Sequence, residues 1–303
     1  MYYDPTTLVT IVTQDTAGNQ GWTSISNSYD PLGFLVARVT EMDNGSTQSE
    51  TFFGPQRLSL TVTDSAANNA SWASRTTEWD WMGNKTTRTT VEDDGDVRIE
   101  NFDVVTGNRI ARTEIDHTDS KGWYSKSTFY DATGKIKIGS ERVTDSGRID
   151  AMTFDEATGA RSSRTITDGG DEHSWHSIST VFDVNTGKKT EQTTVQDDQS
   201  SETLEWVNGK LTVRTEVDGT ADAFEWHSRE TTFDTTGKVA QIREIEDDGD
   251  LVVQTYAGGT LIEQTTYDNA GTEAWHVEQV SYDAAGDVVE TQYFDESGAI
   301  LIV

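Results

Sequence analysis

One tryptophan recurs six times along the chain, at intervals of 49 to 52 residues. Seven residues after each copy comes an aromatic residue, an aspartate follows it directly, and a glycine closes the motif a few positions later. Three features that keep their register through six copies indicate a tandem-repeat architecture. The six tryptophans are Trp22, Trp72, Trp123, Trp175, Trp226 and Trp275. We expect units to start near them in a single array over residues 1–303, with residues 1–21 a partial repeat that supplies a fourth strand.

Each repeat contains four short runs rich in β-branched and aromatic residues, separated by turns of aspartate, asparagine and glycine. In the third repeat these runs cover residues 123–130, 135–143, 148–154 and 160–167. Connections of two to five residues join antiparallel neighbours, because parallel strands need crossovers of about a dozen residues or more. No stretch keeps the apolar spacing of a helix. The pattern predicts an all-β chain of 24 strands.

Two architectures fit four-stranded antiparallel repeats. We expect an open, twisted or coiled β-meander, in which the strands continue from one repeat to the next. The alternative is a six-bladed β-propeller closed by the N-terminal strand. Propeller blades stack face to face and need two largely apolar faces, which the polar strand at residues 188–194 does not provide.

The chain is strongly acidic, with 53 acidic and 23 basic residues and a net charge of −30. This balance excludes nucleic acid as a partner, because binding a phosphate backbone requires lysine and arginine. Cysteine is absent, which excludes disulfides and thiolate metal sites. No apolar run approaches the roughly 20 residues that span a bilayer, so we expect no membrane insertion.

Acidic turns are the candidate metal sites, since carboxylates are ligands for calcium. The two most acidic turns carry Asp93, Asp94 and Asp96, and Asp247, Asp248 and Asp250. The loops before the tryptophans offer further pairs, namely Asp116 with Asp119, Asp168 with Asp171, and Asp218 with Asp222. Calcium needs six to eight converging oxygens, whereas a hairpin turn needs only aspartate and glycine in sequence. We therefore expect turns without a cofactor, with calcium binding as the alternative.

The repeated tryptophans are expected to fill the small core of each repeat, the usual role of a large aromatic in a repeat protein. Trp81 and Trp206 lie outside the repeated position and are the candidate ligand-binding aromatics, which stack on sugars in the carbohydrate-binding alternative. Three histidines directly follow repeated tryptophans. Copies one repeat apart are separated by four strands, about 19 Å, which is too far for them to bind one metal ion together. No constellation breaks the repeat as a single catalytic site would, so we expect no enzyme.

Half-units of the form aromatic-Asp-x-x-Gly at residues 267–271, 282–286 and 294–298 resemble YD repeats, the motif of Rhs-type surface proteins and toxin shells. The whole unit is similar to degenerate repeats of about 50 residues in large acidic, RTX-like proteins that marine alphaproteobacteria export by type I secretion. The resemblance implies a long antiparallel sheet and an extracellular or cell-surface location in bacteria. The second glycine of the YD repeat is usually missing, and the glycine-rich calcium nonapeptide of RTX proteins is absent, so the resemblance does not imply calcium binding of that kind.

Repeats without a special copy supply length and surface rather than a reaction centre. We therefore expect a non-enzymatic structural or adhesive module of a secreted or surface protein. Two uncharged runs rich in β-branched residues are the expected assembly edges. One contains Val9 and Ile11, and the other contains Ile300, Leu301 and Ile302. Unpaired strands of this kind template pairing with another chain. The expected partners are a second copy in head-to-tail contact, or flanking repeats, and in the alternative function glycans.

Overall fold

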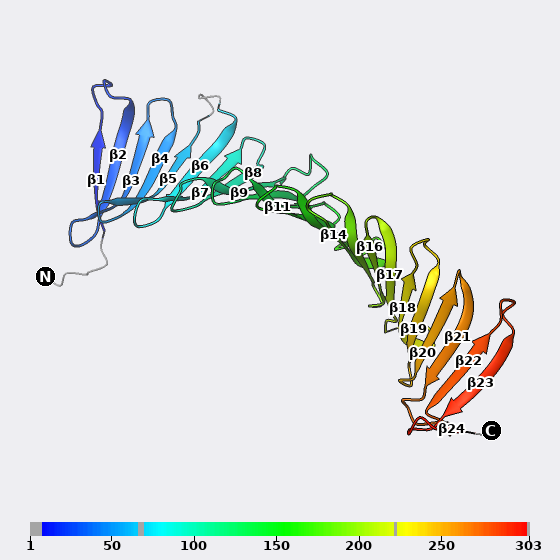
Figure 1. Ribbon diagram of the computed structural model, residues 1–303. Coiled ribbons are helices and arrows are strands. Elements are labelled where there is room, and N and C mark those ends of the chain that lie inside the picture. The colour runs from blue at the N-terminus through cyan, green and yellow to red at the C-terminus, as the bar shows by residue number, and fades with distance from the viewer. Residues whose placement is uncertain (1–7, 66–69, 221–222, 302–303) are drawn as a thin grey trace. The chain divides into compact units, whose positions relative to one another are not determined.

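The computed structural model describes residues 8–65, 70–220 and 223–301. This part of the chain is all-β, with 24 strands and no helix, as the turn pattern predicts (Figure 1). It accordingly has no helix with the length and hydrophobicity to cross a membrane. Ile302 of the predicted assembly edge and Asp222 of the predicted loop pairs lie outside the described residues.

The chain divides into two compact units, Met1–Gly147 and Arg148–Val303. The strands of the first unit are β1 Val9–Gln14, β2 Trp22–Tyr29, β3 Leu35–Met42, β4 Thr47–Phe53, β5 Gln56–Thr63, β6 Trp72–Trp79, β7 Lys85–Glu92, β8 Val97–Phe102, β9 Arg109–Ile115, β10 Ser125–Tyr130 and β11 Lys137–Val143. Those of the second unit are β12 Ile149–Phe154, β13 Arg161–Thr167, β14 Trp175–Phe182, β15 Lys189–Gln196, β16 Ser201–Val207, β17 Lys210–Val217, β18 Trp226–Phe233, β19 Val239–Glu246, β20 Leu251–Ala257, β21 Thr260–Tyr267, β22 Val277–Tyr282, β23 Val288–Phe294 and β24 Ile300–Leu301.

Within each unit, every strand pairs antiparallel with the next one in the chain. This includes the strands on either side of a repeat boundary, such as β5 with β6 in the first unit and β13 with β14 in the second. A propeller would end its hydrogen-bond ladder at the last strand of each blade. The open meander is therefore confirmed and the propeller alternative is wrong; β1, which that alternative assigns to the sixth blade, pairs with β2.

A row of mostly small polar residues crosses the middle of each sheet, one residue per strand. In the first unit it runs through Val12, Ser26, Val39, Ser49, Thr61, Thr76, Thr89, Ile99, Thr113, Ser127 and Glu141. Adjacent members bond through their hydroxyls, for example Thr61 and Thr76 at 2.9 Å. Cross-strand pairs of this type contribute roughly 0.2–1 kcal/mol each.

An aromatic residue stands at or next to the end of every second strand, directly after a bulge. The row consists of Tyr29, Phe52, Trp79, Phe102 and Tyr130 in the first unit, and Phe154, Phe182, Trp206, Phe233, Tyr256 and Tyr282 in the second. The strands that alternate with these carry a lysine or arginine over many of the rings. The Arg57 guanidinium lies 4.5 Å from the Trp79 centroid, and that of Arg161 lies 3.9 Å from the Phe182 centroid. Each such contact is worth about 0.5–1 kcal/mol at exposed sites.

Ion pairs reinforce the face that carries the aromatics. Glu100 of β8 is buried and accepts hydrogen bonds from Arg109 Nη1 at 2.8 Å and Arg88 Nε at 2.7 Å. Burial by itself raises the pKa of Glu100, but the bonds from both arginines outweigh it and leave the pKa below its usual range.

Few apolar side chains are buried. Among the described residues, the buried hydrophobic ones are Ala111, Trp226, Val252 and Val280. The other five repeated tryptophans are only half-buried. Of the six, only Trp226 is buried as expected for a residue that fills the core of its repeat. Each sheet is thus held by its backbone ladder and by rows of cross-strand contacts rather than by a thick core.

Candidate functional site

An aspartate opens the loop before each repeated tryptophan. Its backbone N–H donates to the carbonyl of the residue after the tryptophan, as from Asp116 to Tyr124 at 2.9 Å. Its carboxylate accepts amides from the same loop; Asp268, for example, accepts from Thr272 at 3.0 Å and Glu273 at 2.9 Å. The six aspartates are Asp15, Asp64, Asp116, Asp168, Asp218 and Asp268. Each loop is therefore built around a carboxylate.

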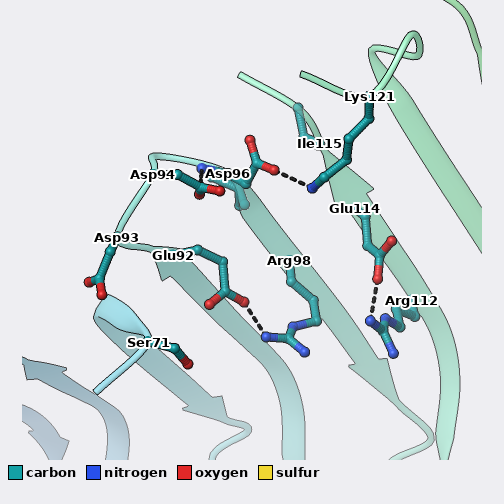
Figure 2. Close-up of a pocket in the computed structure, with 11 residues that line it drawn as sticks. Ser71, Glu92, Asp93, Asp94, Asp96, Arg98, Arg112, Glu114, Ile115 and Lys121 are labelled. Atoms are coloured by element: carbon teal, nitrogen blue, oxygen red, sulfur yellow. Dashed lines mark hydrogen bonds and ion pairs between the residues drawn. The ribbon is translucent and has the colours of Figure 1, made fainter. Parts of the chain in front are cut away.

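One open hollow of about 490 Å³ lies beside such a loop, at the ends of β7, β8 and β9. Figure 2 shows three ion pairs in it: Lys121 reaches Asp96, Arg98 reaches Glu92, and Arg112 reaches Glu114. The residues that line it in the described part of the chain include neither histidine nor cysteine. Most of its carboxylates are neutralised by a neighbouring cation, which suits a charge-balanced surface better than acid–base catalysis.

Asp93, Asp94 and Asp96, the first predicted calcium set, lie in the β7–β8 turn at the rim of this hollow. Asp94 Oδ1 accepts the backbone N–H of Asp96 at 3.0 Å, which closes the turn. Asp96 is buried, and its carboxylate accepts from the His117 amide at 3.1 Å and from Lys121. Asp96 thereby ties the hairpin turn to the loop that follows β9.

Asp116, at the start of that loop, is the most strongly perturbed carboxyl. Burial opposes its ionisation, but hydrogen bonds from the Ser120 and Lys121 amides and the Thr118 hydroxyl outweigh burial and lower its pKa to about 2. Asp116 is therefore a charged anchor of the loop at neutral pH.

The second predicted calcium set, Asp247, Asp248 and Asp250, occupies the equivalent β19–β20 turn. Asp248 Oδ1 accepts from the Asp250 amide at 3.0 Å, and Asp250 Oδ1 from the Ala270 amide at 3.0 Å. Glu273 stands at the position of Lys121, so the cation of the first set is replaced by an acid. Burial and the nearby acids, chiefly Asp248 and Glu244, raise the pKa of Glu246 in this turn. Calcium binding stays a prediction at both turns.

The two candidate ligand-binding aromatics differ in accessibility. Trp81 lies in the β6–β7 turn and is 72% exposed. Trp206, on β16, is a half-buried member of the aromatic row, and Lys189 Nζ lies 4.5 Å from its ring centroid. Of the two rings, that of Trp81 is the one open to a ligand.

Sequence reasoning missed a set of exposed apolar side chains at the hairpin turns on the Trp81 edge of the first unit. The set includes Leu32, Phe34, Phe53, Met82, Val104 and Val105. The signal was the occurrence of large apolar residues inside or beside turns that are otherwise built from aspartate and glycine.

The predicted assembly edges lie on β1, the first strand of the first unit, and on β24, the last strand of the second unit. Val9 and Ile11 are exposed on β1, which pairs with β2 and with no other described strand of the first unit. Ile300 is exposed and Leu301 half-buried on β24, which pairs with β23.

Comparisons with known proteins give no family. No model of a protein family matches the chain, and neither does any curated protein. Among solved structures, a protein from Bacteroides uniformis described as a 6-phosphogluconolactonase is similar at 10% sequence identity, over 97% of this chain and 94% of that chain, with a TM-score of 0.15. A TM-score of 0.15 is too low to carry an argument about fold or function.

Proposed function

We propose that the chain is a non-enzymatic structural and adhesive repeat module of a secreted or cell-surface bacterial protein. The observation that carries the proposal is that the repeated side chains engage one another and the backbone. Arginines cover aromatics, hydroxyls pair across strands, and turn aspartates accept backbone amides. Side chains used in this way build an extended surface rather than a reaction centre.

We further propose that the module associates through its sheet edges, with a second copy or with flanking repeats. The strand β1, with the sequence VTIVTQ, carries no charge, and all six of its residues are exposed. Its outer edge offers backbone donors and acceptors to an added strand. When the edge of one copy meets a different edge of the next, the contact is head-to-tail and propagates into a fibre.

Replacing Ile11 by lysine tests this proposal, because an added charge on an edge strand opposes strand addition. We expect wild-type protein to gain mass with concentration in light scattering, and Ile11→Lys to require at least about tenfold more protein for the same mass, the equivalent of 1.4 kcal/mol. Val207→Lys, an exposed aliphatic position on the internal strand β16, is the matched control and should behave as wild type. A monomer of constant mass, with no filaments by electron microscopy, contradicts self-association.

Carbohydrate recognition is the second candidate function, and the exposure of Trp81 favours it. An open indole ring at a turn can stack on the apolar face of a sugar, much as exposed aromatics bind other flat or amphipathic groups. A glycan array separates the two candidate functions. Glycan binding that Trp81→Ala abolishes supports carbohydrate recognition, whereas an array without signal contradicts it and leaves the structural function as the one candidate.

A further inference from the structure

The loop at residues 168–174 begins with an aspartate that has one carboxylate oxygen without a hydrogen bond, a feature that it shares with the Asp64 loop, part of which lies outside the described residues. The Asp168 side chain is 2% exposed. Its Oδ2 accepts the backbone N–H of His173 at 2.6 Å, whereas its Oδ1 is buried and has no partner among the described residues. A buried acceptor without a hydrogen bond is destabilising, and an ordered water or a bound ion is a common reason why a folded protein keeps one.

The counterpart loop at Asp116 shows what is missing. There Oδ2 accepts the amide of Lys121 at 2.6 Å, as in the Asp168 loop, but Oδ1 accepts the Thr118 amide at 3.2 Å and the Thr118 hydroxyl at 3.0 Å. The loops share their backbone form, since Asp119 and Asp171 have φ of 55° and 53°. The hydroxyl is lost because Gly170 stands where the Asp116 loop has Thr118.

Two ligating side chains appear in the same loop. Glu172 and His173 replace Ser120 and Lys121 of the Asp116 loop. Asp168, Glu172 and His173 can each present one ligand atom such that all three atoms lie within 4.8 Å of one another. The His173 ring rests edge-on against Trp175, with centroids 4.9 Å apart and planes at 79°, which orients the imidazole.

We propose that Asp168, Glu172 and His173 bind a divalent transition metal ion of the zinc class. Calcium prefers six to eight oxygens, whereas zinc accepts imidazole nitrogen together with carboxylate oxygen and is held in open sites by three protein ligands. Asp168 is the buried ligand, and Glu172 and His173 are the exposed ones, with ligand atoms already within 4.8 Å of one another. Zinc takes four ligands, so water or a side chain of a partner would supply the fourth. The net charge of −30 favours the approach of a cation.

The test is a titration of the full chain, without a polyhistidine tag, with Zn²⁺ by calorimetry and with Co²⁺ by visible spectroscopy. We expect binding at one equivalent. His173→Gln should weaken it about 100-fold or more, and Gln20 occupies this position in the Asp15 loop, so the backbone accepts the change. Gly170→Thr, which restores the hydroxyl without altering a ligand, should weaken binding about 10- to 100-fold, as changes around a metal's ligands do.

His176→Gln is the matched control, because His176 lies one residue beyond Trp175, is exposed and is outside the cluster. It should bind Zn²⁺ as wild type does, and circular dichroism checks that each variant is folded. The proposal is overturned if wild type binds no Zn²⁺ at one equivalent, if His176→Gln weakens binding as much as His173→Gln, or if Ca²⁺ binds as tightly as Zn²⁺.

Discussion

Trp226→Ala should lower the free energy of unfolding by about 3–5 kcal/mol, the usual cost of truncating a buried large aromatic. Trp226 is 8% exposed, the lowest value together with Ala111 and Val252 among the buried hydrophobic residues. Its ring stacks on Phe224 at 4.7 Å with planes 9° apart, and the Arg229 guanidinium lies 4.8 Å from its centroid. In a sheet with so few buried apolar side chains, no neighbouring core can fill the space that it leaves.

Urea denaturation followed by circular dichroism measures this effect. Trp81→Ala is the control, because it removes the same side chain from a position that is 72% exposed, and it should change stability by no more than about 0.5 kcal/mol. Equal losses in the two variants would contradict the assignment of Trp226 as the best-packed repeated tryptophan.

The second large effect should appear in acid, where stability should fall as the pH is lowered from about 4 to about 2. The pKa of Asp116 falls from its ordinary value of 3.8 to about 2 in the folded chain. A carboxyl with a lowered folded pKa binds its proton more readily when unfolded, so its contribution is complete above pH 3.8 and is lost as the pH falls through the folded pKa. Other turn carboxyls also have pKa values lowered by hydrogen bonds. The donors are the Asn84 side-chain amide at Asp80 and backbone amides or hydroxyls at the rest. These carboxyls are Asp15, Asp80, Asp103, Asp131, Asp155, Asp183, Asp198, Asp234, Asp268, Asp283 and Asp295.

Two groups act in the opposite direction. Burial raises the pKa of Asp145 and of Glu246, and nearby acids add to the shift, so their ionisation destabilises the fold as the pH rises. They are far fewer than the lowered carboxyls, and the net slope is set by the turns. The check is the melting temperature of wild type and of Asp116→Asn at several pH values: wild type should lose more on acidification than the variant. A melting temperature that is constant or rises towards pH 2 would contradict this account of the turns.

Local sequence signals predicted most of the strands. Asp-Gly turns and β-branched runs placed the strands of the third repeat within two residues of their observed bounds; the predicted strand at 123–130, for example, begins at Ser125 in β10. The repeat boundary carries no sign of a break, and β9 indeed pairs with β10 across it. Such features depend on residues adjacent in sequence, which is why they could be predicted.

Features that depend on register were missed. The aromatic row has half the period of the tryptophan repeat, but its members are followed by different turns: Asp80 follows Trp79, whereas Phe53 and Gly54 follow Phe52. Only the bulged pairing shows that Arg57 lies between these two rings. In the same way, the sequence marks Asp168 as one of six loop aspartates, but the partners of its Oδ1 depend on the folded shape of the loop.

The central claim is that the ladder of strands continues without a break through the repeats of a unit. Because the chain has no cysteine, double cysteine substitutions can report each junction separately. Directly opposed residues of antiparallel strands have Cα atoms about 4.5–5.5 Å apart, within the range that a disulfide bridges. The four successive junctions of one repeat are probed by Ser26 with Val39, Val39 with Ser49, Ser49 with Thr61, and Thr61 with Thr76.

Mass spectrometry after mild oxidation should find the disulfide in all four double variants, including the pair that crosses the repeat boundary from β5 to β6. Cysteines at Ser26 and Thr76, four strands and about 19 Å apart, should stay reduced. If one of the four junctions fails to form its disulfide while the other three succeed, the ladder is interrupted once per repeat, as in separate blades, and the open sheet is contradicted.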